Sequence, residues 1–350
     1  MITDTLSGQR AFNVFGFEVK LHNFAAMLTL AILTLCAMAW SISLGSIDTS
    51  FWNVFEALLG INNSVDQQWA IYDVRLPRLI LAIMAGAAIA LTGAMLQSLT
   101  QNPLADPGLL GLSQGSMIII MILMVFFPGI DRAYYPFAAM LGGLAVGFFI
   151  LSLTGRHFSG GIAILLMGIA VESALSSITL IILLYTPSEV SYSLGIWLNG
   201  SLFLSNWQAI LDFLPWIILG LLIMIFAAKP LSILELGSLR ARTLGSATEV
   251  SKPLILIGSV LISAASVTAV GPLAFLGVLA PQLAAIVSRA TGFTRLVLAA
   301  QMGGLILILA DTLTRVLIST AYMPVGLTII IIGAPIFIIC LRIRLLNQTR

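Results

Sequence analysis

Ser113 lies in a short pattern that is typical of a catalytic nucleophile. Residues 111–115 read GLSQG, which matches the G-x-S-x-G pattern of serine hydrolases. A serine of this kind needs a histidine or lysine base within hydrogen-bond reach. The apolar stretches of the chain contain neither residue type, so an intramembrane serine hydrolase is a hypothesis that lacks its general base.

Glu172 places a carboxylate in the middle of the apolar stretch 161–184. An ionisable group is costly in hydrocarbon, so this side chain should face the protein interior or a water-filled cavity. Two interpretations remain open. The carboxylate either lines a translocation path or makes a structural hydrogen bond to a neighbouring helix.

Two arginines, Arg75 and Arg78, precede the apolar stretch 79–99. A guanidinium keeps its charge and offers a planar pair of donors to a carboxylate. These residues could therefore bind an acidic partner protein at one end of a helix. The alternative is that both side chains reach lipid phosphates.

The elements that must position these groups are membrane helices. Hydrophobic residues make up 59% of the chain and charged residues 9%, with a mean hydropathy of +1.09, whereas a soluble domain has about 25% charged residues. One span takes about 20 residues. We therefore predict an all-α, polytopic membrane protein with about ten transmembrane helices in a single domain, 1–350. The net charge of +2 gives no reason to expect a nucleic-acid partner.

Ten apolar runs follow one another along the chain. The seventh and eighth are separated by Gly271-Pro272, because proline removes a backbone donor and interrupts a straight helix. The runs cover residues 24–44, 79–99, 112–128, 136–154, 161–184, 209–228, 254–270, 272–288, 296–318 and 325–341.

Small residues recur four apart in the second run. This spacing makes a ridge along one helix face, on which another helix can pack closely in lipid. The ridge consists of Ala82, Gly86, Ala90, Ala94 and Ser98. Tight packing inside the helix bundle is its expected role.

The lysines and arginines are distributed unevenly between the two faces. An even number of spans puts both termini on one side. Arg75, Arg78, Arg132 and Arg315 fall on the opposite face, and the other twelve of the sixteen basic residues fall on the face of the termini. Because cytoplasmic loops carry the excess of basic residues, we predict cytoplasmic termini, a cytoplasmic segment 1–23, and four outward-facing arginines.

The longest segment on the predicted cytoplasmic face spans residues 229–252. It contains turn residues and more leucines and isoleucines than a free loop needs. A short helix–turn–helix at the membrane surface fits it, with its apolar side chains packed on this bundle or on another protein. A solvated connecting loop is the alternative.

Four segments together resemble the FecCD-type permeases, the membrane subunits of type II ABC importers for ferric siderophores, haem and cobalamin. The first runs from 75 to 115 and contains the most specific stretch, NPLADPGLLG at 102–111. The others are LELGSLRARTLG at 234–245, GPLAFLGVLAPQLA at 271–284, and ADTLTRVL with MPVGLTIIIIGAPIF between 310 and 337. The resemblance runs in order from about residue 40 to the carboxyl terminus.

The resemblance implies four groups of site residues. Docking of a periplasmic binding protein falls to Arg75, Arg78 and Arg315. Coupling to the ATPase falls to Leu234, Leu236, Gly237, Ser238, Arg240, Ala241, Arg242, Leu244 and Gly245. The cytoplasmic gate corresponds to Asn102, Pro103, Leu104, Gly160 and Gly161. Path-lining positions correspond to Glu172, Gly333 and Pro335.

Two positions depart from the family pattern. Ser238 stands where an acidic residue is usual, and Gln282 stands where the family tends to have histidine. These departures leave the expected fold unchanged and put the detail of the ATPase contact in doubt. They also suggest one half of a heterodimer whose partner keeps the usual residues.

The resemblance implies a transport subunit of the bacterial inner membrane without chemistry of its own. A second permease subunit, identical or homologous, two ATPase subunits and a periplasmic binding protein would complete the importer. ATP and Mg²⁺ would bind the ATPase, and this chain would need no cofactor or metal. A ferric siderophore is the first choice of metal-chelate cargo, followed by haem and cobalamin. A secondary transporter driven by an ion gradient is the alternative from another class.

Overall fold

The structure, a computed structural model, describes residues 2–3, 10–14, 17–44, 51–58, 64–131, 134–154, 161–317 and 323–348. Within this part of the chain, six helices are long and apolar enough to cross a membrane, and four more are apolar but shorter. Each overlaps one predicted run, which confirms the prediction of about ten spans. They are α1 (Leu21–Ser43), α4 (Leu76–Thr100), α5 (Leu112–Phe126), α6 (Tyr135–Thr154), α7 (Gly161–Tyr185), α9 (Trp207–Leu234), α11 (Thr248–Val270), α12 (Leu276–Val287), α13 (Gly292–Leu317) and α14 (Val325–Gln348).

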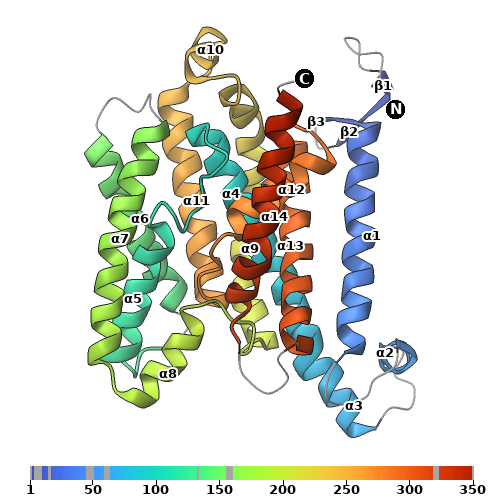
Figure 1. The fold of residues 1–350 in the computed structure, drawn as a ribbon, viewed down its shortest axis with the longest axis vertical. Helices are drawn as coiled ribbons and strands as arrows, with labels where there is room; N and C mark the ends of the chain where they lie inside the picture. Colours follow the sequence, from blue (N-terminus) through green and yellow to red (C-terminus); the bar gives the residue numbers. More distant parts are fainter. Residues whose placement is uncertain are drawn as a thin grey trace.

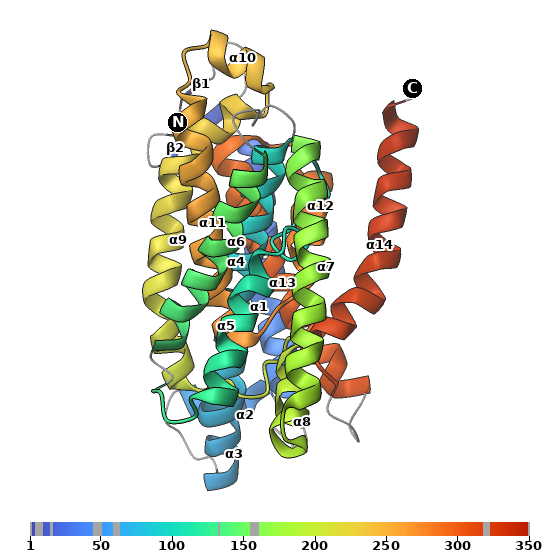
Figure 2. The ribbon, with the colours of Figure 1, turned by 90° about the vertical axis from the view of Figure 1, so that its left-hand side faces the viewer.

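The helices run roughly side by side, and both chain ends lie at the same end of the bundle (Figure 1). The short helix α10 (Ser238–Thr243) projects beyond the bundle at that end. In the view turned by 90°, α14 stands at the edge and its carboxyl-terminal half leans away from the other helices (Figure 2). These two views define a terminal end, which carries α10, and an opposite end.

Helix α4 forms the centre of the bundle. It contacts α13, α11, α12 and α9, and 78% of its most apolar window is buried. A helix that is apolar on all sides belongs in a core or a membrane, and α4 satisfies both conditions.

The predicted ridge of small residues lies at a helix crossing. All five of its members are buried. A Cβ added at Gly86 would lie 2.4 Å from the carbonyl oxygen of Gly303 in α13, and one added at Gly303 would lie 2.2 Å from the carbonyl oxygen of Gly86. The two backbones therefore touch without intervening side chains, and the expected role in tight packing is confirmed.

The break between α11 and α12 falls where Gly271-Pro272 predicts it. Gly271 adopts φ +76°, and a Cβ there would lie 2.2 Å from the carbonyl oxygen of Trp197. Helix α12 begins after this turn and has 12 residues, about 18 Å at 1.5 Å per residue. Since the hydrocarbon core is about 30 Å thick, α12 by itself is shorter than a full crossing.

Several elements at the opposite end lie outside the predicted runs. They are α2 (Phe51–Leu58), α3 (Val65–Trp69), the π-helical turn η1 (Ala70–Arg75) and α8 (Ser188–Trp197). Helix α3 and η1 continue into α4, so that one helical segment runs from Val65 to Thr100. The polar side chains of 66–68 and Asp73 lower the local hydropathy, which explains why the apolar run begins later than the helix.

The first residues form a small antiparallel sheet at the terminal end, in the order β1 (Ile2–Thr3), β2 (Arg10–Val14), β3 (Phe17–Lys20). Phe17 stacks on Phe293 at the start of α13, with ring centroids 4.7 Å apart. This contact holds β3 against the start of α13.

Candidate functional site

Asp311 gathers two of the three predicted docking arginines at the opposite end of the bundle. Arg78 donates from Nε and Nη2 to Asp311 Oδ1, at 2.9 and 2.6 Å. Arg315, one helical turn after Asp311, donates from Nε to Oδ2 at 3.2 Å. The carboxylate is 1% exposed, against 19% for the Arg78 side chain and 23% for that of Arg315.

The third arginine binds the neighbouring backbone. Arg75 is buried, and its Nη1 donates to the carbonyl oxygen of Ile42 at 2.6 Å. Arg315 also donates to the end of α1, to the carbonyl oxygens of Ser41 and Leu44. We call Arg75, Arg78, Asp311 and Arg315 the arginine cluster. Within it, the guanidinium groups of Arg78 and Arg315 share the single carboxylate of Asp311.

The predicted coupling segment forms a protruding turn at the terminal end. Helix α9 continues through Lys229 to Leu234, and α10 follows after a short turn. Gly237 and Gly245 bracket α10 with φ of +104° and +77°, values that glycine adopts without steric cost. The predicted short helix–turn–helix is present as the end of α9, a turn and α10.

The apolar side chains of this segment divide between two surfaces. Leu234 and Ala241 are 1% and 0% exposed and pack toward the bundle, whereas Leu236 and Leu244 are 50% and 62% exposed. Arg240 and Arg242 are exposed as well. One set of side chains in this segment thus packs on the bundle, and another set of leucines and arginines points outward. The sequence offered this bundle or another protein as the packing partner of the segment, and the structure leaves side chains available for both.

The predicted gate residues 102–104 form the turn that ends α4. Gln101 closes the helix in the left-handed region, with φ 54°. Asn102 Oδ1 then accepts from the backbone N–H of Leu104 at 2.9 Å, and Leu104 is 40% exposed. We call residues 101–111, which include the predicted gate residues 102–104, the gate loop. Gly161 is the first residue of α7, and Gly160 lies outside the described residues.

Asp106 fixes the second half of the gate loop. It is 2% exposed, and its Oδ2 accepts from the backbone N–H of Gly108 at 2.9 Å. Burial raises the pKa of the Asp106 carboxyl to about 6, and the backbone N–H of Gly108 acts in the opposite direction. A Cβ added at Gly277 would lie 2.2 Å from Asp106 Oδ1, so the loop packs closely against the start of α12.

Glu172 makes a hydrogen-bonded bridge to a neighbouring helix. Its Oε1 accepts from Ser176 Oγ at 2.7 Å, and Ser176 Oγ accepts from Gln114 Nε2 of α5 at 2.7 Å. A Cβ at Gly111 would lie 3.2 Å from the backbone nitrogen of Glu172. The structural interpretation of this carboxylate therefore has direct geometric support, while its role in a path stays a prediction.

Ser113 lacks the surroundings of a nucleophile. It is 6% exposed, and its Oγ lies 3.3 Å from Ser263 Oγ. A serine hydroxyl is too weak a base to activate a second hydroxyl. The local geometry therefore gives the hydrolase hypothesis no general base.

Comparison with known proteins identifies the chain. The model of the FecCD transport family matches residues 31–343. The chain belongs to the FecCD transport family. The iron(3+)-hydroxamate import system permease protein FhuG of Bacillus subtilis is 33% identical over 305 residues, which cover 85% of this chain and 90% of that protein. The hemin transport system permease protein HmuU of Yersinia pestis is 33% identical over 322 residues, covering 88% and 92%.

A solved structure has the same fold. An inward-facing metal-chelate type ABC transporter aligns with a TM-score of 0.77 and 24% identity, covering 91% of this chain and 99% of that one. The FecCD chain is thus a multi-pass membrane permease with the type II ABC importer fold.

Gln282, one of the two departures from the FecCD pattern, lies beneath the gate loop. It is 6% exposed, and its Nε2 donates to the carbonyl oxygen of Pro103 at 3.1 Å. Its side chain therefore contacts this chain's own loop. The side chain of Ser238, the other departure, is outside the described part of the structure.

The two predicted path residues on α14 differ in their surroundings. Gly333 is buried against α12, since a Cβ there would lie 2.8 Å from Leu279 Cδ2. Pro335 lies inside the helix and is exposed. These positions leave one face of α14 uncovered by this chain, and the path-lining role stays a prediction.

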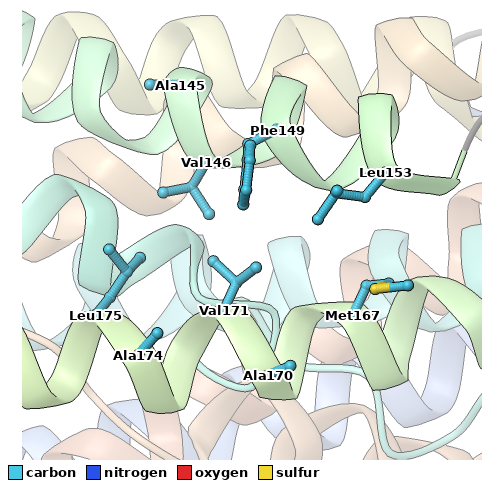
Figure 3. Close-up of a pocket in the computed structure, with 9 residues that line it drawn as sticks. All are labelled: Ala145, Val146, Phe149, Leu153, Met167, Ala170, Val171, Ala174 and Leu175. Atoms are coloured by element: carbon cyan, nitrogen blue, oxygen red, sulfur yellow. The ribbon is translucent and has the colours of Figure 1, made fainter.

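A pocket of about 520 Å³ opens between α6 and α7 (Figure 3). Its lining side chains are all apolar and include Val146, Phe149, Met167 and Val171. A hydrophilic metal chelate needs hydrogen-bonding or charged partners. The described lining residues of this pocket offer no such group.

Asp311 is the site residue that sequence reasoning missed. It lies within the predicted run 296–318, so Glu172 is not alone among carboxylates inside the apolar runs, and Asp311 is the more buried of the two. The available signal was its position four residues before Arg315, a spacing at which opposite charges meet on a helix.

Proposed function

We propose that this FecCD permease is one membrane subunit of an ATP-driven importer for a ferric chelate. The observation that carries the proposal is the exposure of Leu236 and Leu244, which flank α10 at the end of the bundle where the gate loop also lies. Exposed leucines on a rigid projection are suited to a groove on another protein. An ATPase subunit would move this projection and open the path by alternating access.

The arginine cluster would receive a periplasmic binding protein at the opposite end. Arg78 and Arg315 keep about a fifth of their side chains exposed and would offer the contacts, while Arg75 would hold the end of α1. Exposed charge pairs contribute about 0.2–1 kcal/mol each, which orients a partner and still lets it leave. A second permease subunit would cover the exposed faces of α7 and α14.

Ferric siderophores are the proposed cargo class. The names of the similar permeases include iron(3+)-hydroxamate in Bacillus subtilis, Fe(3+) dicitrate and ferric enterobactin in Escherichia coli, and hemin in Yersinia pestis. Three of these four are iron(3+) complexes of small chelators, and haem is the second candidate. The terminal end of the permease would face the cytoplasm of a bacterial inner membrane.

Uptake of radioactive iron into proteoliposomes tests this proposal. The purified complex should import a ferric hydroxamate or a related chelate when the binding protein is outside and ATP inside. Reversing the charges of Arg78 and Arg315 together should weaken capture of the binding protein and leave ATPase assembly intact. Unchanged capture would contradict the docking role, and import that continues without ATP but follows a proton gradient would favour a secondary transporter.

A further inference from the structure

We propose that a buried polar network connects the coupling segment to the gate loop and positions that loop during transport. The network consists of Glu235, Arg295, Ser98, Gln97 and Gln282. It joins α9, α13, α4 and α12 at the terminal end. The inference rests on the proposed function, because it assigns the network a part in the same transport cycle.

The network starts beside the coupling helix. Glu235 caps the end of α9, three residues before α10 begins. Its Oε1 accepts from Arg295 Nη1 at 2.6 Å and from Ser98 Oγ at 2.9 Å. The two charged side chains are 17% and 21% exposed. A displacement of α10 therefore acts first on a charged hydrogen bond that is largely removed from solvent.

Arg295 carries the connection to the centre of the bundle. Its Nη1 donates to Ser98 Oγ at 2.7 Å, and its Nη2 donates to Gln97 Oε1 at 3.1 Å. Both acceptors are 3% exposed and belong to the last turns of α4. A guanidinium has a planar, fixed set of donors, so its rotation moves both contacts together.

Gln282 completes the connection to the gate loop. Its Nε2 lies 3.3 Å from Gln97 Oε1 and 3.1 Å from the carbonyl oxygen of Pro103. Gln97 Nε2 in turn donates to the carbonyl oxygen of Gly277 at 3.2 Å. A parallel link exists, because Gln101 Nε2 donates to the carbonyl oxygen of Leu234.

The burial of these groups makes them move together. An unpaired polar group in a dry interior costs about 1–3 kcal/mol, so the amides and the ion pair keep their partners when the surrounding helices shift. The side chain of Gln282 contacts the gate loop at the carbonyl oxygen of Pro103, whereas Gln97 meets the loop through its backbone, where its carbonyl oxygen accepts from the N–H of Asn102. We therefore assign Gln282 as a positioning residue and Arg295 as the residue that links it to Glu235.

The test measures cargo imported per ATP hydrolysed, using the complete complex in proteoliposomes. Gln282→Met keeps the length of the side chain and removes its donor. We expect normal assembly, unchanged basal ATP hydrolysis and about a tenfold fall in cargo per ATP, because a buried hydrogen bond to the gate loop is lost. Gln282→His, which restores an N–H donor, should recover most of the loss. Cargo per ATP equal to that of the unmodified complex would overturn the inference.

Ser288→Ala is the matched control. Ser288 is 5% exposed at the same end, and its Oγ donates to Asn23 Oδ1 at 2.6 Å, away from the gate loop. This variant loses a buried hydrogen bond of similar kind and should keep its cargo per ATP. An equal loss in Ser288→Ala would show a general effect of weakened packing and would overturn the specific role of Gln282.

A second measurement does not depend on cargo or on the stability of one variant. A spin label at Leu104→Cys, in the exposed part of the gate loop, should change mobility when ATP binds the complex. Gln282→Met and Arg295→Met should each abolish this change, while a label at Leu244→Cys on the coupling segment still responds. A response at position 104 that persists in both variants would overturn the network. Failure of the unmodified complex to import any ferric chelate would instead count against the proposed function alone.

Discussion

At the level of single residues, Asp311 holds together the charges at the opposite end of the bundle. It is 1% exposed and accepts from both Arg78 and Arg315. Removing one partner of a buried ion pair costs about 3–5 kcal/mol, and the partial exposure of the arginines favours the lower end. Asp311→Asn should therefore lower the free energy of unfolding by about 3 kcal/mol, measured by denaturant titration in detergent.

The control for Asp311 is an aspartate that is exposed and has no arginine as its hydrogen-bond donor within the described part of the chain. Asp212 is exposed and accepts from Gln208 Nε2 at 2.8 Å within α9. Asp212→Asn should change the unfolding free energy by no more than about 0.5 kcal/mol. Similar losses in both variants would mean that Asp311 has no special role in the arginine cluster.

The residue scale also marks the limit of prediction from sequence. Arg75 and Arg78 stand out because charges flank an apolar run. Their partners do not stand out, because Arg78 and Asp311 are 233 residues apart and only the packing of α4 on α13 brings them together. For the same reason Gln282 could be noticed as a departure from the family but not placed under the gate loop.

At the scale of elements, the crossing of α4 and α13 depends on two glycines. A Cβ at Gly303 would lie 2.2 Å from the carbonyl oxygen of Gly86, and a backbone cannot withdraw as a flexible side chain does. Gly303→Ala should therefore destabilise the protein by about 1–3 kcal/mol or more. Thermal unfolding in detergent measures this effect.

The same substitution elsewhere provides the comparison for Gly303. A Cβ at Gly195, inside α8, would meet nothing within 4 Å. Gly195→Ala should leave the unfolding midpoint unchanged or raise it, since alanine is favoured over glycine in a helix by up to about 1 kcal/mol. Equal tolerance of alanine at both positions would contradict the close backbone contact.

The coupling segment gives the second prediction at this scale. Leu236 and Leu244 are exposed, so aspartate at both positions should leave the fold intact and release the ATPase subunit during co-purification. Leu204, 69% exposed at the opposite end, is the matched position, and Leu204→Asp should keep the ATPase bound. Retention of the ATPase by the Leu236→Asp, Leu244→Asp variant would place its contact elsewhere on the permease.

On the scale of the whole molecule, the bundle follows directly from hydropathy, because each span must satisfy its backbone hydrogen bonds internally. The ten apolar runs and the break at Gly271-Pro272 are therefore readable from sequence. The helices α2, α3 and α8 are not, since amphipathic or polar helices at a membrane surface lack a continuous apolar run. The sheet before α1 depends on tertiary contacts such as that of Phe17 with Phe293, which local sequence does not encode.

The orientation of the bundle in the membrane decides which partner protein each end can reach. The distribution of basic residues predicts that the terminal end faces the cytoplasm, which would put the arginine cluster outside.

Val65 in α3 is 83% exposed and Leu244 beside α10 is 62% exposed, so cysteines at these positions report on the two ends. In a variant with Cys36 and Cys340 replaced by alanine, a membrane-impermeant maleimide should label Val65→Cys in intact spheroplasts. It should label Leu244→Cys only after permeabilisation. The reverse pattern would turn the arginine cluster toward the cytoplasm, where no periplasmic binding protein could reach it.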